Sequence, residues 1–280
     1  MNKKSILIIV SAVVLIVIAV ALGRLILSVI KRTPSSADSQ MSASLSVDVK
    51  KISADAKKME ENGDLVSARA AYQKLVNDYP NSREVMDWQK RFEDLNIRLL
   101  LSPVITPKSI EYEIKPGDSL DKIAREYKTT VELIMKSNNL SGENIFPGKK
   151  IKVWTAPFSI VVDKSQNTLI LKSNEEVIKT YIVATGLNNS TPVGTFKIIE
   201  KIVNPPWYKP GGGMIPAGNP QNILGTRWLG LDKEGYGIHG TTEPQSLGKQ
   251  ATAGCVRMLN AEVEQLFSIV PKGTEVTIVD

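Results

Sequence analysis

Cysteine and histidine are almost absent from this chain of 280 residues, which contains one of each. A single cysteine excludes an intramolecular disulfide, so Cys255 is either a small buried side chain or a reactive thiol. One histidine and one cysteine, without a cluster of carboxylates, fall short of a typical zinc-ligand set. We therefore expect no bound metal.

The chain also lacks an excess of one charge in its C-terminal part. Its net charge is +6, but residues 1–109 hold 16 basic and 11 acidic side chains, whereas residues 157–280 hold 11 of each. No basic cluster interleaved with aromatic side chains occurs there, so we do not expect nucleic-acid binding. The run Gly211-Gly212-Gly213 lies in a proline-rich loop, not between a strand and a helix, so it predicts no nucleotide site. No cofactor is expected.

Charge is missing altogether from residues 6–23, where Ser11 is the only polar side chain. At about 1.5 Å per helical residue this run spans about 27 Å, close to the hydrocarbon thickness of a bilayer. We predict a single membrane-spanning helix over residues 5–30. The competing interpretation is a cleaved signal peptide, because two lysines precede the run and the small residues 19–21 resemble a cleavage site. Basic residues flank both ends, so charge does not fix the orientation.

Residues 31–48 are rich in Ser and Ala without a hydrophobic period, and are predicted to be a flexible linker. Residues 49–101 show helical spacing instead, with a third helix expected from about Ser82. Small, turn and core residues fall where an antiparallel helix pair needs them: Ala56, Gly63, Asp64, Ala68, Tyr72, Leu75 and Pro80. The pattern resembles one tetratricopeptide-type repeat. We interpret it either as a plain helical spacer or as a docking segment for a protein partner.

Residues 110–154 show a compact pattern of strand, turn, two short helices and a returning strand, after a short linker at 105–109. Pro116-Gly117-Asp118 makes the turn, and Thr129 and Glu132 have the spacing of a capping box. The segment is similar to a LysM module, a small α+β fold. This resemblance implies binding to glycans that contain N-acetylglucosamine, such as peptidoglycan.

From residue 157 the hydrophobic period becomes two, which predicts strands at 159–163, 168–172 and 178–184. We therefore expect residues 157–280 to form a mostly β domain. Residues 203–220 contain five prolines and four glycines, so they are predicted to be irregular. Such a stretch is either a surface insertion or a wall or lid over a cleft.

The two scarcest residues, His239 and Cys255, lie sixteen positions apart, and each is beside a glycine. A cysteine nucleophile needs a base within hydrogen-bond reach and backbone N–H groups placed for the oxyanion. Gly254 and Cys255 are candidates for those N–H groups. Scarcity and spacing leave open an inert cysteine and a structural histidine.

Longer motifs surround these two residues: Thr191-Pro-x-Gly-x-Phe196, Ile238-His-Gly-Thr241, Gly248, Thr252-x-Gly-Cys-Val-Arg-Met258 and Pro271-x-Gly-Thr-x-Val276. Together they resemble the YkuD-type L,D-transpeptidase catalytic domain over residues 157–280. The resemblance implies that Cys255 attacks a peptidoglycan tetrapeptide stem, releases the terminal D-Ala and forms a thioester that an amine of a neighbouring stem resolves. It also implies that His239 is the base and that the Gly240 carbonyl orients it.

Three neighbouring residues add to this expectation. Arg257 would support the site electrostatically, or else form an ordinary ion pair with Glu262 or Glu264. Ala253 stands where the most familiar form of the motif has a second histidine, which puts a proton relay at this position in doubt. Asn260 is predicted to cap a following helix.

The expected protein is multidomain, with a membrane helix, a helical spacer, a LysM module and a mostly β transpeptidase domain. Its substrate and binding partner would be peptidoglycan. It would then be anchored in the cell envelope, with the C-terminal domains outside the cytoplasmic membrane. Two alternatives stay open: an L,D-carboxypeptidase that uses water as acceptor, and a non-catalytic scaffold that binds peptidoglycan.

Overall fold

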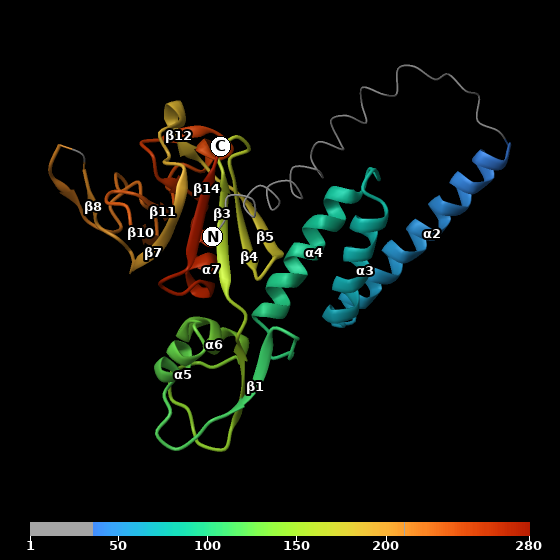
Figure 1. Ribbon diagram of the computed structural model, residues 1–280, viewed down its shortest axis with the longest axis horizontal. Coiled ribbons are helices and arrows are strands. Elements are labelled where there is room, and N and C mark those ends of the chain that lie inside the picture. Colours follow the sequence, from blue (N-terminus) through green and yellow to red (C-terminus); the bar gives the residue numbers. More distant parts are fainter. Residues whose placement is uncertain (1–35, 210) are drawn as a thin grey trace, which may run out of the picture. The chain divides into compact units, whose positions relative to one another are not determined.

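The computed structural model describes residues 36–209 and 211–280, with side chains from residue 48 onward (Figure 1). The predicted membrane helix over residues 5–30 lies outside these residues. Among the helices that are described, none has the length and apolar character needed to cross a membrane. The chain divides into two compact units, one up to Phe92 and one from Glu93, so the division falls within α4 (Val85–Leu100).

The first unit is helical, as predicted, and contains α2 (Ser36–Glu61), α3 (Leu65–Asp78) and the first half of α4. Asp64 caps α3, because its carboxylate accepts a hydrogen bond from the Ser67 N–H at 3.1 Å. The buried face of α3 consists of Ala68, Tyr72 and Leu75. One expectation differs from the structure: residues 36–48, predicted to be a linker, are helical. No Gly or Pro follows Pro34 before Gly63, so nothing in the sequence interrupts the helix.

The second unit begins with the predicted two-helix, two-strand module. Strand β1 (Ser109–Glu113) pairs antiparallel with β2 (Lys150–Trp154), and α5 (Leu120–Glu126) and α6 (Val131–Ser137) lie between them in sequence. The predicted capping box is off by one residue, since Thr130 accepts the hydrogen bond from the Leu133 N–H. Thr129 precedes the cap and is buried.

The main body of the second unit is, within the described residues, an eight-stranded sheet in the order β13-β11-β10-β7-β14-β3-β4-β5. Its strands are β3 (Phe158–Asp163), β4 (Thr168–Ser173), β5 (Glu176–Ile182), β7 (Gly194–Val203), β10 (Arg227–Leu231), β11 (Gly237–His239), β13 (Val256–Arg257) and β14 (Glu275–Val279). The predicted strands at the start of this domain are confirmed as β3, β4 and β5. Helix α7 (Asn260–Ile269) packs against β10 and β11.

Short elements complete the domain. Strand β6 (Thr185–Gly186) pairs with β12 (Gln250–Thr252), and β8 (Trp207–Tyr208) pairs with β9 (Met214–Ile215). Two 3-10 turns, η1 (Leu187–Asn189) and η2 (Pro244–Ser246), lie in the connecting loops. The prediction that residues 203–220 are irregular is therefore wrong in part, because β8 and β9 form a hairpin.

Buried contacts join the module at 109–154 to the rest of the second unit. Helix α6 packs on α7, where the Thr130 hydroxyl donates to the carbonyl oxygen of Ser268. The ammonium of Lys152 in β2 donates to Leu99 O at 2.6 Å and to Ser102 O at 2.9 Å, and so caps the end of α4. Burial lowers the pKa of Lys152 to about 8. The last residues of α4 therefore pack within the second unit, although the sequence analysis placed them in the helical spacer.

Candidate active site

The pairing of two short strands brings His239 and Cys255 together. Strands β11 and β13 are parallel, and the register aligns Ile238 with Val256 and His239 with Arg257. Successive side chains of a strand point to opposite faces, so Cys255, two residues before Arg257, shares the face of His239. Ile238 and Val256 occupy the opposite face and are buried in the core. The register therefore turns a separation of sixteen residues into one shared surface.

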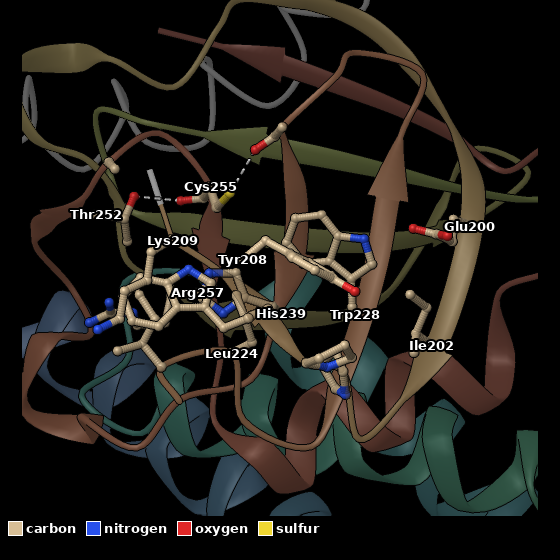
Figure 2. A pocket seen from close by; sticks show the side chains of 16 residues that line it. Glu200, Ile202, Tyr208, Lys209, Leu224, Trp228, His239, Thr252, Cys255 and Arg257 are labelled. Atoms are coloured by element: carbon tan, nitrogen blue, oxygen red, sulfur yellow. Dashed lines mark hydrogen bonds between the residues drawn. The ribbon is translucent and has the colours of Figure 1, made fainter. Parts of the chain in front are cut away.

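This surface forms part of the wall of a cavity of about 530 Å³ (Figure 2). The lining comes from strands β7, β8, β10, β11, β12 and β13 and from the loops between them: Glu200, Ile202, Pro205, Pro206, Trp207, Tyr208, Lys209, Ile223, Leu224, Trp228, Gly235, His239, Thr252, Ala253, Cys255 and Arg257. His239 is only 2% exposed, whereas Cys255 is partly open to the cavity. The stretch at 203–220 thus supplies a wall, one of the two roles open for it.

Hydrogen bonding fixes the tautomer of His239. Its Nδ1 lies 2.7 Å from the carbonyl oxygen of Gly240, the contact that the sequence motif predicted. A carbonyl oxygen can only accept, so Nδ1 carries the proton and Nε2 keeps a lone pair. His239 can therefore receive a proton at Nε2.

Asn260 holds the loop that carries this carbonyl. Its Oδ1 accepts from the N–H groups of Thr226, at 3.2 Å, and Thr241, at 3.1 Å, while its Nδ2 donates to Thr241 O at 2.9 Å. A Cβ atom on Gly240 would lie 2.1 Å from Asn260 Oδ1, so glycine is required there for space. The prediction that Asn260 caps α7 is wrong. The cap position is Leu259, and the Asn260 amide is engaged by the neighbouring loop instead.

Burial keeps both reactive groups neutral. It lowers the pKa of His239 to about 4; the positive charge of Arg257 acts in the same direction, and the bond to Gly240 opposes it. Burial also raises the pKa of the Cys255 thiol, while a backbone hydrogen bond from Gly237 and the charge of Arg257 oppose that shift. The resting pair at neutral pH is therefore a thiol and a neutral imidazole, not an ion pair.

The loop that carries Cys255 is held by Thr252. The Thr252 hydroxyl donates to Cys255 O at 2.6 Å and accepts from the Gly254 N–H at 3.1 Å, and the thiol itself points to Gly235 O at 3.5 Å (Figure 2). Gly254 was a candidate oxyanion donor, but its N–H is already used by Thr252. The N–H of Cys255 is the remaining candidate of the two.

Arg257 is 4% exposed and lies beside the reactive pair on the same strand face. Its Nη1 donates to Glu243 Oε2 at 2.7 Å and to Ser246 Oγ at 3.0 Å. The expected alternative, an ion pair with Glu262 or Glu264, is wrong, because β13 directs the guanidinium toward the loop around η2. Its buried Nε has no hydrogen-bond partner among the described residues. Arg257 therefore keeps one buried N–H group that no described residue engages.

Sequence reasoning missed two residues of the site. Trp228 lines the cavity and stacks on His239, and Asn260 organises the histidine loop. Alternation in the segment Arg227–Leu231 would have placed Trp228 on one face of a strand. The partner of that strand depends on contacts that no local pattern shows.

Known proteins resemble this chain over the same segments. The family model described as L,D-transpeptidase catalytic domain matches residues 157–278, and the LysM domain model matches residues 112–154. A Bacillus licheniformis relative named as the L,D-transpeptidase YkuD is 37% identical over 175 residues, which are 60% of this chain and 97% of the relative. A Bacillus subtilis relative named as the L,D-transpeptidase YqjB is 41% identical over 145 residues, 50% of this chain and 76% of the relative.

Among solved structures, an L,D-transpeptidase from Mycobacterium smegmatis aligns with 48% of this chain and 64% of its own, at 17% identity and a TM-score of 0.39.

Proposed function

The chain belongs to the YkuD family of L,D-transpeptidases, and from that premise we propose that Cys255 and His239 carry the acyl transfer. The observation that supports these roles is the parallel register of β11 and β13, which puts both side chains on one face of the sheet beside one cavity. The substrates are the stem peptides of peptidoglycan, and the LysM domain points to binding of the same polymer.

In the first half of the reaction, His239 Nε2 takes the proton of Cys255 Sγ as the sulfur attacks the carbonyl carbon of the third stem residue. The Cys255 N–H stabilises the oxyanion. The C–N bond to the terminal D-Ala then breaks, and the imidazolium returns its proton to the leaving amine. The product is a thioester on Cys255 and free D-Ala.

In the second half, an amine of a neighbouring stem attacks the thioester carbonyl. His239 takes a proton from the attacking amine, the C–S bond breaks, and the thiolate recovers that proton. Because the resting groups are neutral, charge develops only when substrate is in place. Arg257 lies close enough to shift the pKa values of both groups, so it supports the negative charge that develops during attack.

The position of the enzyme in the cell is part of the same proposal. Residues 5–30 form a membrane anchor, and residues 49–101 form a tetratricopeptide-like spacer or a docking segment for a protein partner. The C-terminal domains then lie in the envelope, outside the cytoplasmic membrane. The uncharged run at 6–23 and the extracytoplasmic location of peptidoglycan support this arrangement. A glycan-binding domain beside the catalytic domain raises the local concentration of both stems.

Mass spectrometry tests the chemistry. The full chain is incubated with disaccharide-tetrapeptides, alongside Cys255→Ala and His239→Gln. We expect loss of D-Ala and formation of crosslinked dimers with the wild type, a thioester adduct on the intact protein, and none of these with Cys255→Ala. Retained binding to insoluble peptidoglycan is the control that each variant is folded.

D-Ala loss without dimers would assign the carboxypeptidase reaction instead. Turnover by Cys255→Ala would contradict the proposed nucleophile, and wild-type turnover by His239→Gln would contradict the proposed base.

A further inference from the structure

Trp228 is the direct neighbour of the catalytic base across the sheet. Strand β10 is antiparallel to β11, and the register pairs Trp228 with His239. The centres of the two rings are 6.0 Å apart and their planes differ by 22°, so the indole stacks on the imidazole. Both side chains line the cavity that contains Cys255 (Figure 2).

Two glycines make room for the indole. The next pair on the same face of β10 and β11 is Gly230 with Gly237. A Cβ atom on Gly237 would lie 2.6 Å from two carbons of the Trp228 six-membered ring, and a Cβ atom on Gly230 would lie 2.8 Å from its Nε1. Neither glycine has a positive φ. These glycines are therefore required by space and not by backbone conformation, and they form a floor on which the indole lies flat.

The stack restrains the tilt of the imidazole ring, which the hydrogen bond to Gly240 does not fix. The bond from Nδ1 to Gly240 O fixes which nitrogen of His239 carries the proton, but the ring can still tilt about that contact. A flat aromatic surface against one face of the imidazole limits this tilt. The direction of Nε2 depends on both restraints.

We propose that Trp228 is a positioning residue for His239: seated on Gly230 and Gly237, its indole holds the imidazole plane so that Nε2 keeps one orientation relative to Cys255. The inference rests on the proposed role of His239 as base. The indole face also stabilises the imidazolium that forms after the thiol loses its proton, because a cation within about 6 Å of an indole face is attracted to it. This contribution is large where water is excluded, as it is around His239.

The single histidine of the chain makes the test direct, because histidine labelled with ¹³C and ¹⁵N gives the signals of one imidazole. The full chain in detergent micelles is compared with Trp228→Phe, which keeps an aromatic face, and Trp228→Leu, which removes it. Trp207→Leu is the matched control, since Trp207 lines the same cavity but is not the tryptophan stacked on His239.

In the wild type we expect an Nδ1–H tautomer and His239 ring protons shifted upfield by the indole. Trp228→Phe should keep most of that shift and stay within about threefold of the wild-type kcat. Trp228→Leu should lose the shift, show mixed tautomers or broadened signals, and lower kcat by about tenfold to a hundredfold with KM nearly unchanged. Trp207→Leu should leave the His239 spectrum unaltered.

Gly230→Ala provides a second route if Trp228→Leu does not fold, because the added methyl would lie 2.8 Å from Trp228 Nε1 and must displace the indole while Trp228 itself remains. We expect the same loss of ring shift and of kcat. The inference is overturned if the folded Trp228→Leu protein keeps the wild-type tautomer and kcat, or if its only change is a higher KM, which would make Trp228 a substrate contact. Wild-type activity in His239→Gln would overturn the role of the base itself, whatever Trp228 does.

Discussion

Two asparagines support different parts of the catalytic cavity, and in both cases the side-chain amide binds backbone groups. Asn260 binds the backbone of Thr226 and Thr241 and so fixes the loop that follows His239. Asn222 donates to Pro205 O at 2.9 Å and accepts from the Leu224 N–H at 3.0 Å, which fixes the apolar wall around Trp207.

The surroundings of the two asparagines differ. Near Asn260 lie His239 and Arg257, which are 2% and 4% exposed. Near Asn222 the wall continues into the hairpin of β8 and β9, where Tyr208 is 73% exposed. Loss of the Asn260 amide should therefore impair the chemistry, whereas loss of the Asn222 amide should impair substrate binding.

The largest effect is expected from Asn260→Ala. It leaves the N–H groups of Thr226 and Thr241 and the carbonyl of Thr241 without their partner, so the loop that carries the Gly240 carbonyl is no longer held. We expect kcat to fall about a hundredfold and the free energy of unfolding to fall by about 2 kcal/mol. Steady-state kinetics and urea denaturation measure the two quantities. Asn260→Asp keeps the acceptor oxygens, so its kcat and its free energy of unfolding should lie between those of the wild type and Asn260→Ala. A loss of stability with unchanged kcat would show that this loop does not affect the chemistry.

The pH profile tests whether the reactive pair of His239 and Cys255 is neutral. Below its pKa of about 4, His239 is protonated and cannot take the thiol proton, so kcat/KM should fall about tenfold per pH unit there. Because burial raises the pKa of Cys255, the rate should be flat from about pH 5 to 8. A fall in rate between pH 7 and 8.5 would instead indicate a thiolate and imidazolium pair.

The same buried histidine makes stability depend on pH. Its folded pKa lies below the ordinary value of 6.5, so between about pH 4 and 6.5 the unfolded chain binds more protons than the folded one. The contribution of His239 to stability is complete above that range and is lost as the pH falls through it. His239→Gln should reduce this dependence in denaturation measurements.

The effect of the Arg257 guanidinium on the reactive pair can be tested by substitution. Arg257→Met removes a positive charge that disfavours the imidazolium, so the pKa of His239 should rise, as histidine NMR would report. We also expect kcat to fall about tenfold, because the developing negative charge loses its cation. Arg227→Met is the matched control, since Arg227 pairs with Glu264 at 3.8 Å. An unchanged His239 pKa in Arg257→Met would show that the cation does not act on the base.

Local patterns predicted the fold well where elements are built from neighbouring residues. The strand, turn and helices of residues 110–154 lie within one short segment, and the period-two run after residue 157 gave β3, β4 and β5 because these strands pair in sequence order. The errors there are small, such as Thr130 in place of Thr129 as a cap.

Contacts between distant residues were the part that could not be predicted. Motifs placed Cys255 and His239 in one site. For Arg257 the expected ion-pair partner was Glu262 or Glu264 if it did not support the site, whereas the observed partner is Glu243, in a loop whose path depends on the whole sheet. Trp228 was missed because its role comes from pairing with β11. Asn260 was mistaken for a cap because, in sequence, an asparagine at the start of a helix looks the same whether it serves the helix or another loop.

The smallest effect, and the one that completes the comparison of the two asparagines, is expected from Asn222→Ala. Asn222 is 4% exposed, and its amide holds Pro205 and Leu224, which line the cavity. Loosening this wall removes contacts that substrate makes equally in the ground state and the transition state, so KM should rise about fivefold while kcat stays within about twofold. Asn222→Asp keeps the acceptor for the Leu224 N–H and should recover part of the loss. A fall in kcat as large as that of Asn260→Ala would mean that the cavity behaves as one unit, with no separation between a part that binds substrate and a part that carries the chemistry.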